Sequence, residues 1–373
     1  MLQSLKVMLQ RRSLMNIFVI LSTEGDNMQK VLIIGCPGSG KSTFARKLHE
    51  QTQIPLYHLD NLFWNANRTT VEDSVFKARL QEVLAQDAWI IDGNFSSTME
   101  WRMQGCDTIF FLDYPTDVCL AGVRERKGKK RSDIPWIEET DDEEFLQFIK
   151  DFSEKRRPQI LELLNKYNDK KIYIFTSRND ANRYLCAKAY DLICDPWSSY
   201  RKPINKCIQD FCKYLPEKAK ILDVGCGNGY PISKYLIDSG YQVTGIDISE
   251  KMISKAKELP GEFSVCDFME YASDTKFDAI IAFDSLWHIP LELQKDIYNK
   301  MYDLLADGGY CLFTHGIRHS EVSGEMFEQL FYYSSLDIDE LKTCLSDFII
   351  IEEYHPYVEE TTGDRELLMI IKK

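Results

Sequence analysis

Short apolar runs alternate along the chain with longer stretches in which apolar residues recur at helical spacing. Continuous apolar runs of this length are typical of strands buried in a parallel sheet. The runs form two groups, at 31–34, 55–59, 89–91, 108–112 and 172–175, and then at 221–224, 241–246, 263–266, 277–283 and 310–314. The alternation predicts two α/β domains, each a three-layer αβα sandwich around a parallel sheet. Two further runs, Phe348–Tyr354 and Leu367–Ile371, predict a hairpin that makes the last strand of the second sheet antiparallel.

The domain boundaries follow from the same pattern. The chain has 373 residues, which suits two domains of ordinary size. We predict a first domain at 28–186, a linker or entrance segment rich in turn-forming and aromatic residues at 187–200, and a second domain at 201–373. Residues 1–27 loosely resemble a signal or transit segment, because basic residues precede an apolar run. We expect them instead to be a poorly ordered extension and exclude them from the prediction of the fold.

Composition narrows the class of partner. The formal net charge is −13, and an acidic chain repels a phosphate backbone, so we expect no nucleic-acid partner. The 11 cysteines include no C-x-x-C pair, which indicates reduced cytoplasmic thiols rather than a disulfide framework or a zinc site. No run approaches the roughly 18 apolar residues of a membrane span, so no membrane partner is expected. These features predict a cytoplasmic protein that acts on small molecules, and they leave its oligomeric state open.

The most informative stretch of the second domain is Ile221–Asp247. An apolar strand leads into the turn Gly225-Cys226-Gly227-Asn228-Gly229, and a helical pattern and a second strand follow. Glycines let the backbone turn tightly and let a ligand approach the main chain. Asp247 lies 22 residues beyond Gly225, close to the roughly 20-residue spacing at which an acid reaches ribose hydroxyls. The pattern fits a dinucleotide or a single nucleoside, and the G-x-G-x-G spacing with the acid at Asp223 favours the nucleoside.

Together with Gly245–Ser249 and the L-x-D-G-G turn at Leu305–Gly309, this stretch resembles the class I S-adenosylmethionine-dependent methyltransferases across the whole second domain. The resemblance implies S-adenosylmethionine as the methyl donor. It implies as donor-binding residues Asp223, Gly225, Cys226, Gly227, Asn228, Gly229, Asp247, Ile248, Met252, Asp267, Phe268 and Asp284. A base is needed only if the acceptor loses a proton; His288 is the first candidate and His315 the second, with a packing role as the alternative for each.

The methyl acceptor is less clear from the sequence. The chain has no N-P-P-Y or D-P-P-Y after the fourth strand, which argues against methylation of base amines in DNA. A small organic acceptor is therefore expected. Six aromatic residues would form either a pocket over the site or part of the core, namely Phe327, Phe331, Tyr332, Tyr333, Tyr354 and Tyr357.

The first domain opens with a phosphate-binding motif. Gly35–Ser42 reads G-C-P-G-S-G-K-S, which matches G-x-x-x-x-G-K-S between a strand and a helix. Backbone N–H groups of such a loop point at the β-phosphate, Lys41 adds a positive charge, and the Ser42 hydroxyl suits Mg²⁺. The motif predicts ATP and Mg²⁺ as ligands, held by Gly35, Gly38, Ser39, Gly40, Lys41, Ser42 and Thr43.

The groups at 56–64 and 90–95 and the strand end F-L-D-Y-P resemble adenylate-kinase-related P-loop proteins, some of them labelled topology-modulation proteins. The resemblance implies a phosphotransferase with a mobile lid, here Val123–Ile134, whose Arg124, Arg126 and Arg131 clamp phosphates, with Arg102 and Arg178 assisting. It also implies that Asp60 contacts the acceptor as a base and that Asp92 holds Mg²⁺ through water. Asn94-Phe95-Ser96 replaces the F-P-R of adenylate kinases, which disfavours AMP and leaves a nucleoside or another small hydroxyl compound.

Three functional hypotheses follow. The leading one is a methyltransferase fused to a P-loop phosphotransferase. In the second, the P-loop domain binds nucleotide and regulates the methyltransferase without transferring phosphate. In the third, both halves are binding domains of an assembly protein, which the intact turns and strand-end acids disfavour. For the basic lid segment, a solvated loop and a nucleic-acid patch are the alternatives to a phosphate clamp.

Overall fold

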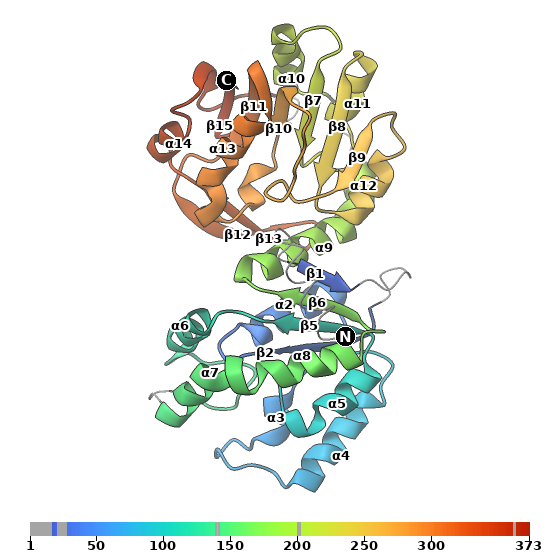
Figure 1. Ribbon diagram of the computed structural model, residues 1–373, viewed down its shortest axis with the longest axis vertical. Helices are drawn as coiled ribbons and strands as arrows, with labels where there is room; N and C mark the ends of the chain where they lie inside the picture. Colours follow the sequence, from blue (N-terminus) through green and yellow to red (C-terminus); the bar gives the residue numbers. More distant parts are fainter. Residues whose placement is uncertain (1–16, 21–27, 139, 141, 200–202, 361–362) are drawn as a thin grey trace. The chain divides into compact units, whose positions relative to one another are not determined.

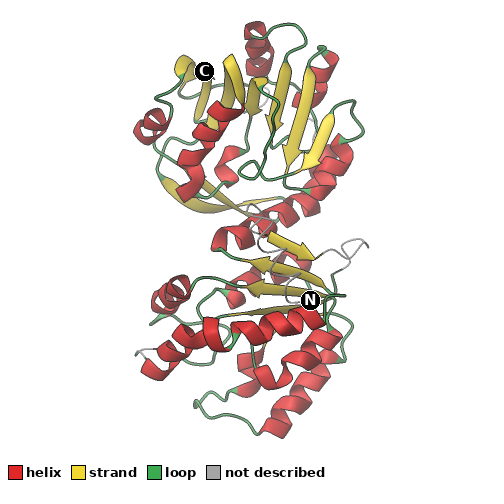
Figure 2. Ribbon diagram, in the orientation of Figure 1, coloured by secondary structure: helices red, strands yellow, loops and turns green. Residues whose placement is uncertain are grey.

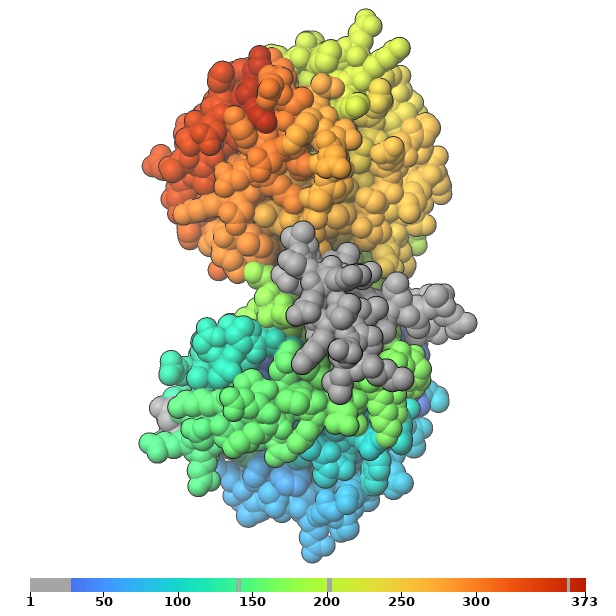
Figure 3. Space-filling model, in the orientation of Figure 1, coloured from blue at the N-terminus to red at the C-terminus, as the bar shows by residue number. Residues whose placement is uncertain are grey.

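The structure is a computed structural model that describes residues 17–20, 28–138, 140, 142–199, 203–360 and 363–373. The chain divides into two compact units, Met1–Asn182 and Arg183–Lys373. Each unit is a continuous stretch of sequence, as the colours of the ribbon and space-filling views show (Figures 1 and 3). Each of them combines helices with one large sheet (Figure 2).

The sheet of the first unit has the strand order β1-β6-β5-β2-β4-β3. Its strands are β1 Ile17–Ile20, β2 Lys30–Gly35, β3 Leu56–His58, β4 Trp89–Asp92, β5 Thr108–Leu112 and β6 Lys171–Phe175. All neighbours pair in parallel except β1, which is antiparallel to β6. The side chains of Val31–Ile34 in the central strand β2 have no exposed surface, as a continuous apolar run predicts.

The helices of the first unit are α2 Lys41–Thr52, α3 Leu59–Phe63, α4 Asp73–Leu84, α5 Ser96–Gly105, α6 Thr116–Arg126, α7 Glu143–Lys155 and α8 Arg157–Lys166. Helix α2 packs against β2, β3 and β4, so the helix that follows the Gly-rich loop is anchored on the sheet. Two expectations are corrected here. Ile17–Ile20 forms an edge strand although residues 1–27 were expected to be an extension, and the other residues of that segment lie outside the described part. Leu59 and Asp60 begin a short helix rather than ending a strand.

Arg102 has a structural role that excludes the predicted contact with phosphate. Its side chain is fully buried, and its guanidinium donates to the carbonyls of Gly93 (2.7 Å), Asn94, Phe95 (3.0 Å) and Thr98 (3.3 Å). Burial lowers the pKa of Arg102 to about 9, so the side chain remains charged at neutral pH. It therefore stabilises the turn between β4 and α5, because its N–H groups donate to backbone carbonyls of that turn and not to a ligand.

The sheet of the second unit has the order β14-β15-β11-β10-β7-β8-β9. Its strands are β7 Lys220–Val224, β8 Gln242–Asp247, β9 Glu262–Val265, β10 Phe277–Ala282, β11 Leu305–His315, β14 Ile349–Tyr354 and β15 Leu367–Lys372. Strand β15 is antiparallel to both β11 and β14, as predicted, and the pairs from β11 to β9 are parallel. The helices are α9 Arg178–Ser199, which begins in the first unit, α10 Lys206–Phe211, α11 Ile232–Asp238, α12 Glu250–Ala256, α13 Gln294–Leu304 and α14 Ile338–Cys344, with short 3₁₀ turns η1 Cys212–Tyr214, η2 Leu286–His288 and η3 Leu291–Leu293.

Successive residues of the central strands of this sheet are buried in two different hydrophobic clusters. Leu222 and Ile280 belong to one cluster, whereas their neighbours Ile221 and Ile281 belong to the other. Because successive strand side chains point to opposite faces, both faces of the sheet must be covered. This arrangement confirms the predicted three-layer architecture of the second unit, and it leaves the carboxyl ends of the parallel strands as the place for a ligand.

Three features of the second unit differ from the prediction. Residues 187–199 continue helix α9, whose last turn includes Pro196, and do not form a turn-rich linker. In that turn the hydroxyls of Ser198 and Ser199 donate to the carbonyls four residues earlier. The expected turn at Leu305–Gly309 is part of β11, next to a shift of register. A two-stranded hairpin, β12 Ser320–Met326 and β13 Gln329–Ser335, was not predicted.

No helix in the described ranges is both long and apolar enough to cross a membrane.

The role of Arg102 predicts the effect of its removal. Arg102→Met keeps most of the buried volume but removes the side-chain donor to the carbonyls of Gly93 and Asn94, whereas Phe95 still accepts from Thr98. It should lower the free energy of unfolding of the first unit by about 3 kcal/mol. Urea denaturation measures the stability, and hydrogen exchange reports on the β4–α5 turn. The control is Lys77→Met, which removes only a half-exposed ion pair with Asp73 within α4. Equal stability of the two variants would contradict the role assigned to Arg102.

Candidate functional site

The second unit contains a cavity of about 460 Å³ at the carboxyl ends of β7, β8 and β10. This volume lies within the roughly 300–1,000 Å³ of small-molecule sites. Every predicted donor-binding residue except Gly229 lines it, as does His288. Gly229 serves packing instead, because a Cβ there would lie 2.6 Å from the Leu259 side chain. Tyr190, Trp197 and Ser198 of the predicted linker or entrance segment also line it. Further lining residues that the sequence analysis did not assign are Asn205, Tyr230, Phe283, Ser285, Met326 and Arg365.

The Gly-rich turn forms one wall of the cavity. The amides of Gly225 and Cys226 both donate to the carbonyl of Ile246, at 2.8 and 3.0 Å, which joins the ends of β7 and β8. Gly225 has φ +73°, and a Cβ on it would lie 2.4 Å from the Cβ of Ser285. At Gly227, by contrast, the nearest atom to an added Cβ would be the indole nitrogen of Trp197 at 4.0 Å. The turn therefore exposes bare main chain to the cavity at Gly227.

Asp247 ends β8 opposite this turn. Its carboxylate accepts from the amide of Gly227 at 2.9 Å and from the amide of Ser249 at 2.8 Å. Burial raises the pKa of Asp247 to about 6, although these backbone hydrogen bonds act to lower it. A carboxylate has about four acceptor positions, so this one retains capacity to accept from a hydroxyl group. It is thus a fixed, partly desolvated acceptor at the end of a strand.

Two other acids of the cavity are held by protein groups. Asp223 accepts from the hydroxyl of Ser233 at 2.5 Å, and burial raises the pKa of Asp223 to about 7. Asp267 accepts from the guanidinium of Arg183 at 3.0 Å and from the amide of Met269 at 2.6 Å. Asp223 therefore braces the start of the turn against α11, while Asp267 is fixed at the end of β9 with oxygen positions still available.

Asp284 follows β10 and is paired with Arg365, which the sequence analysis missed. The Arg365 guanidinium binds both carboxylate oxygens, with N–O distances of 2.5 to 2.8 Å, and lies 5.1 Å from the ring centroid of Phe283. Asp284 has φ +56°, and its amide donates to the hydroxyl of Thr314 at 2.7 Å. Asp284 and Arg365 thus form a bidentate ion pair on the cavity wall, in which the arginine balances the charge of the carboxylate.

Both ring nitrogens of His288 are engaged. One lies 2.7 Å from the hydroxyl of Tyr190, and the other lies 2.8 Å from the carbonyl of Tyr332. Burial lowers the pKa of His288 to about 4, so the ring is neutral near pH 7. His315, the second predicted base, does not line the cavity; its Nδ1 lies 2.6 Å from the carbonyl of Gly316.

The unpredicted hairpin and the end of α9 complete the cavity. Met326 and Phe327 at the hairpin tip line it, and the Phe327 ring lies 6.3 Å from that of Trp197. Of the other aromatic residues proposed for a pocket, Phe331 is buried against Tyr190 and the remaining four do not line the cavity. Phe268 and Phe327 were therefore predicted at the site, and Tyr190 and Trp197 belong to the segment predicted as a linker or entrance segment.

In the first unit, the Gly-rich loop and Lys41 lie together at the end of β2. The Lys41 ammonium donates to the carbonyls of Gly35 and Cys36, at 2.8 and 2.9 Å, and burial lowers the pKa of Lys41. The Ser39 hydroxyl is buried and has no hydrogen-bond partner among the described residues. Gly40 has φ +90°, and a Cβ on it would meet nothing within 4 Å. The loop is therefore open on the side of Gly40, with a lysine held at its mouth.

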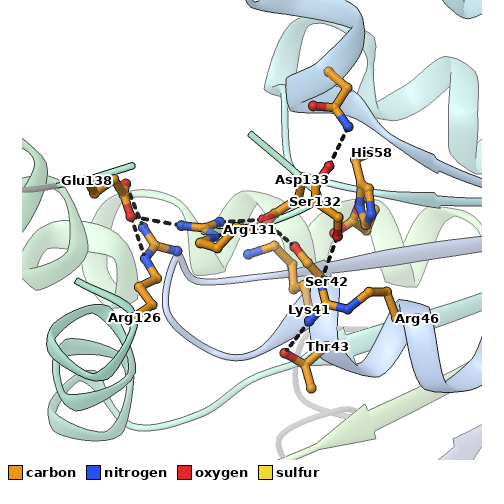
Figure 4. A network of polar contacts seen from close by, with 12 residues as sticks. Lys41, Ser42, Thr43, Arg46, His58, Arg126, Arg131, Ser132, Asp133 and Glu138 are labelled. Atoms are coloured by element: carbon orange, nitrogen blue, oxygen red, sulfur yellow. Dashed lines mark hydrogen bonds and ion pairs between the residues drawn. The ribbon is translucent and has the colours of Figure 1, made fainter. Parts of the chain in front are cut away.

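A polar network crosses from the lid segment to this loop (Figure 4). The Ser42 hydroxyl donates to Asp133 at 2.8 Å, and Arg131 donates to both oxygens of Asp133. Glu138 accepts from Arg131 at 2.8 Å and from Arg126 at 3.0 Å. The hydrogen bonds and charge of Arg131 outweigh burial and hold the pKa of Asp133 well below its usual range. Asp133, which no motif indicated, thus fastens the lid segment to the first turn of α2.

The other residues predicted for the phosphate site of the first unit are two acids and two arginines. Asp92 accepts from His58 at 2.6 Å, while burial, followed by the charge of Asp92, raises the pKa of Asp60 to about 6. Arg124 is exposed near the end of α6, and Arg178 pairs with Glu125 at 3.3 Å. No group of three or more His, Cys, Asp or Glu side chains in the described part of the chain is placed to hold a metal ion. Binding of Mg²⁺ at Ser42 and Asp92 stays a prediction.

Comparison with known proteins bears on the second unit. Residues 221–309 match the family model of a methyltransferase domain. The methyltransferase YqeM of Bacillus subtilis (strain 168) is 38% identical over 109 residues, which cover 26% of this chain and 43% of that protein. The 27-O-demethylrifamycin SV methyltransferase of Amycolatopsis mediterranei (strain S699) is 38% identical over 87 residues, covering 20% and 32%. The chain thus spans less than half the length of these relatives.

Solved structures found in the comparison include a SAM-dependent methyltransferase from Methanosarcina mazei, with TM-score 0.39, 23% identity, and coverage of 46% of this chain and 98% of that one. Another is the 1,6-didemethyltoxoflavin-N1-methyltransferase of Burkholderia thailandensis, with TM-score 0.42, 19% identity, and coverage of 51% and 86%. By the family match and the sequence relatives, residues 221–309 of the second unit are similar to a methyltransferase domain. The family match lies wholly within that unit.

The network around Asp133 predicts a local change in dynamics. Asp133→Ala removes the acceptor shared by Ser42 and Arg131, so the backbone of residues 127–137 should exchange amide hydrogens at least about tenfold faster. Hydrogen-exchange mass spectrometry measures this, with Asp117→Ala on the exposed face of α6 as the control. Unchanged exchange in the lid segment would show that Asp133 does not fasten it.

Proposed function

We propose that the second unit transfers the methyl group of S-adenosylmethionine to a small-molecule acceptor. The observation that carries this proposal is the pairing of the bare main chain at Gly227 with the half-buried carboxylate of Asp247 on one cavity wall. A nucleoside needs both features, because its sugar hydroxyls require an acceptor and its body requires close approach to the backbone. The match of residues 221–309 to a methyltransferase domain supports the same conclusion.

The residues present fit the donor. Asp247 would accept from the ribose hydroxyls, Asp267 from the adenine amine, and Phe268 would lie beside the adenine ring. The Gly225–Gly227 turn and Asp223 would border the amino-acid part of the donor. When bound, the donor supplies an electrophilic methyl group on a positively charged sulfur. The protein's contribution is to orient the two reactants and to exclude water, and for a reactive donor these effects supply much of the rate.

The acceptor is proposed to be a small organic molecule. The cavity of about 460 Å³ must hold both the donor and the acceptor, which leaves limited room for a large substrate. The part of the wall beyond the donor-binding residues combines the aromatic side chains of Trp197, Phe283 and Phe327 with the Asp284–Arg365 pair. An apolar wall with a few fixed polar groups is typical of sites for small molecules.

Donor binding should depend on the charge of Asp247. The pKa of Asp247 is raised to about 6 in the free protein, and hydroxyl hydrogen bonds to its ionised form would lower the pKa on binding. Affinity should therefore be full above pH 7 and about tenfold weaker at pH 5, because protonation removes the acceptor. Isothermal titration with S-adenosylmethionine measures this dependence.

Asp247→Asn should bind the donor at least about tenfold more weakly at pH 7.5 and lose the pH dependence due to this group. Asp238→Asn on the exposed face of α11 is the control and should behave as the unmodified chain. Absence of heat with the unmodified chain, or equal affinity of Asp247→Asn, would remove the basis of the proposal.

We also propose that the first unit binds ATP with Mg²⁺ and transfers its phosphoryl group to a nucleoside or another small hydroxyl compound. The open loop at Gly40, the lysine at its mouth and the fastened lid arginines Arg126 and Arg131 support this proposal. Asp60, whose pKa burial raises to about 6, would serve as the base for the acceptor hydroxyl. The alternative is a unit that binds nucleotide and regulates methyl transfer, and the lid latch at Asp133 favours a conformational response of this kind.

Lys41 provides the test of nucleotide binding. Lys41→Ala should weaken ATP binding at least about tenfold, since a buried positive charge at the loop is lost, while Lys47→Ala on the same helix should not. Fluorescence titration with a labelled ATP analogue and Mg²⁺ measures both. Nucleotide binding without phosphorylation of any nucleoside in a panel would favour regulation, and no difference between the two variants would contradict both readings.

A further inference from the structure

The contacts of His288 fix its protonation state. The carbonyl of Tyr332 can only accept a hydrogen bond, so the nitrogen that lies 2.8 Å from it, Nδ1, carries the proton. In the neutral ring Nε2 then has a free lone pair, and it must accept the hydrogen bond from the Tyr190 hydroxyl at 2.7 Å. The proton of Tyr190 therefore points at His288, and the phenolic oxygen retains its lone pairs for another donor.

Both rings line the same cavity as Gly227 and Asp284, so the pair borders the reaction space. The basic nitrogen of His288 is already occupied by Tyr190, and a substrate proton would reach it through the tyrosine oxygen. The sequence analysis named His288 as the first candidate for the base and did not connect it with Tyr190. The structure instead presents a two-residue chain in which Tyr190 is the group available to a substrate.

The surroundings of the pair are apolar. The ring of Phe331 lies 4.8 Å from Tyr190 and 5.8 Å from His288, and Tyr333 and Trp287 lie 5.0 and 6.4 Å from His288. Charged groups act on the pair from a distance, chiefly Asp247 and Asp284 on Tyr190, and the Asp284 charge is balanced by Arg365. Burial raises the pKa of Tyr190 and lowers that of His288, so both are neutral at rest.

We propose that Tyr190 is a catalytic residue that takes the proton of the methyl acceptor and passes its own proton to His288, and that the acceptor is an aromatic hydroxyl compound. The inference rests on the proposed methyl transfer and names its acceptor class. As the acceptor oxygen bonds to the methyl carbon, the carbon–sulfur bond of the donor breaks. The acceptor proton moves to the oxygen of Tyr190, the Tyr190 proton moves to Nε2 of His288, and the products are the methyl ether and S-adenosylhomocysteine.

The balance of charge makes this transfer feasible in a buried site. The positive charge of the sulfonium disappears in the same step that creates the imidazolium of His288, so the net charge of the cavity does not change. Moving a charge within an apolar site avoids the larger penalty of creating one there. The Nδ1–H···O=C bond to Tyr332 persists and strengthens when the ring becomes positive.

The cavity wall favours an aromatic hydroxyl over an aliphatic one. Trp197, Phe283 and Phe327 supply flat apolar surface in the cavity that the pair also lines. A phenolic hydroxyl has a pKa near 10, whereas an aliphatic alcohol is a far weaker acid and would need a stronger base than imidazole. An acceptor that loses its proton during attack is the only kind that needs such a chain.

The experiment compares acceptors with and without a proton to lose. The full chain is assayed with radiolabelled S-adenosylmethionine and phenol, catechol or pyridine as probes. Pyridine is methylated on a nitrogen that carries no hydrogen. The variants are Tyr190→Phe and His288→Gln, and the control is Tyr333→Phe, which removes a neighbouring hydroxyl outside the pair.

We expect Tyr190→Phe and His288→Gln to lower methylation of phenol or catechol about a hundredfold, the scale of general base catalysis, while methylation of pyridine changes less than about twofold. Tyr333→Phe should match the unmodified chain on every probe. Full activity of Tyr190→Phe on the hydroxyl probes, or equal loss on all probes, would overturn the inference. So would a chain that binds the donor but methylates neither hydroxyl probe, whereas a chain that does not bind the donor fails the proposed function itself.

Discussion

The hydrogen bond from the Gly227 amide to Asp247 links the two features on which the second unit depends. It holds a turn with positive φ angles against the end of the next strand, so that main chain and carboxylate face one cavity. The turn is possible because Gly225 has no Cβ, which would otherwise collide with Ser285. The cavity remains open because Gly227 has no side chain either. The sheet supplies the rigidity, since both of its faces are covered by hydrophobic clusters. A flexible acid at the same position would lose part of its binding free energy to ordering.

Four carboxylates line one cavity, and each is held in a different way. Asp223 is braced by a serine, Asp247 by backbone amides, Asp267 by Arg183 and Asp284 by Arg365. Because two of the four are neutralised by arginines, the cavity does not carry the full repulsion of four buried negative charges. Asp247 is held by backbone amides instead, and burial raises its pKa to about 6. This division of roles leaves Asp247 as a carboxylate without a cationic partner among the described residues, which suits it to the role of hydroxyl acceptor that we propose.

The parts of the structure that depend on local sequence could be predicted, and the parts that depend on distant residues could not. The buried strand Ile221–Val224, the glycine turn and the position of Asp247 all follow from spacing within a short stretch. Tyr190 lies 98 residues from His288 and Arg365 lies 81 residues from Asp284, so no local pattern indicates either contact. The hairpin β12–β13 was missed for another reason. Its tip, Phe327-Glu328, has positive φ angles without the glycine or asparagine that normally signals such a turn.

The same distinction applies to the first unit. The G-x-x-x-x-G-K-S loop could be read directly, whereas Asp133 is 91 residues from its partner Ser42. Arg102 shows the converse error, since an arginine near a phosphate loop suggested catalysis although its guanidinium is used by four backbone carbonyls. Residue type indicates which contacts a side chain is able to make, and the tertiary structure decides which of them it makes.

The most direct measurement is a crystal structure of the full chain with S-adenosylhomocysteine. The account predicts that the two ribose hydroxyls lie within hydrogen-bond distance of the Asp247 carboxylate, with the sulfur in the part of the cavity bordered by Tyr190 and Asp284. A ligand bound elsewhere, or an Asp247 carboxylate turned away from the sugar, would contradict it.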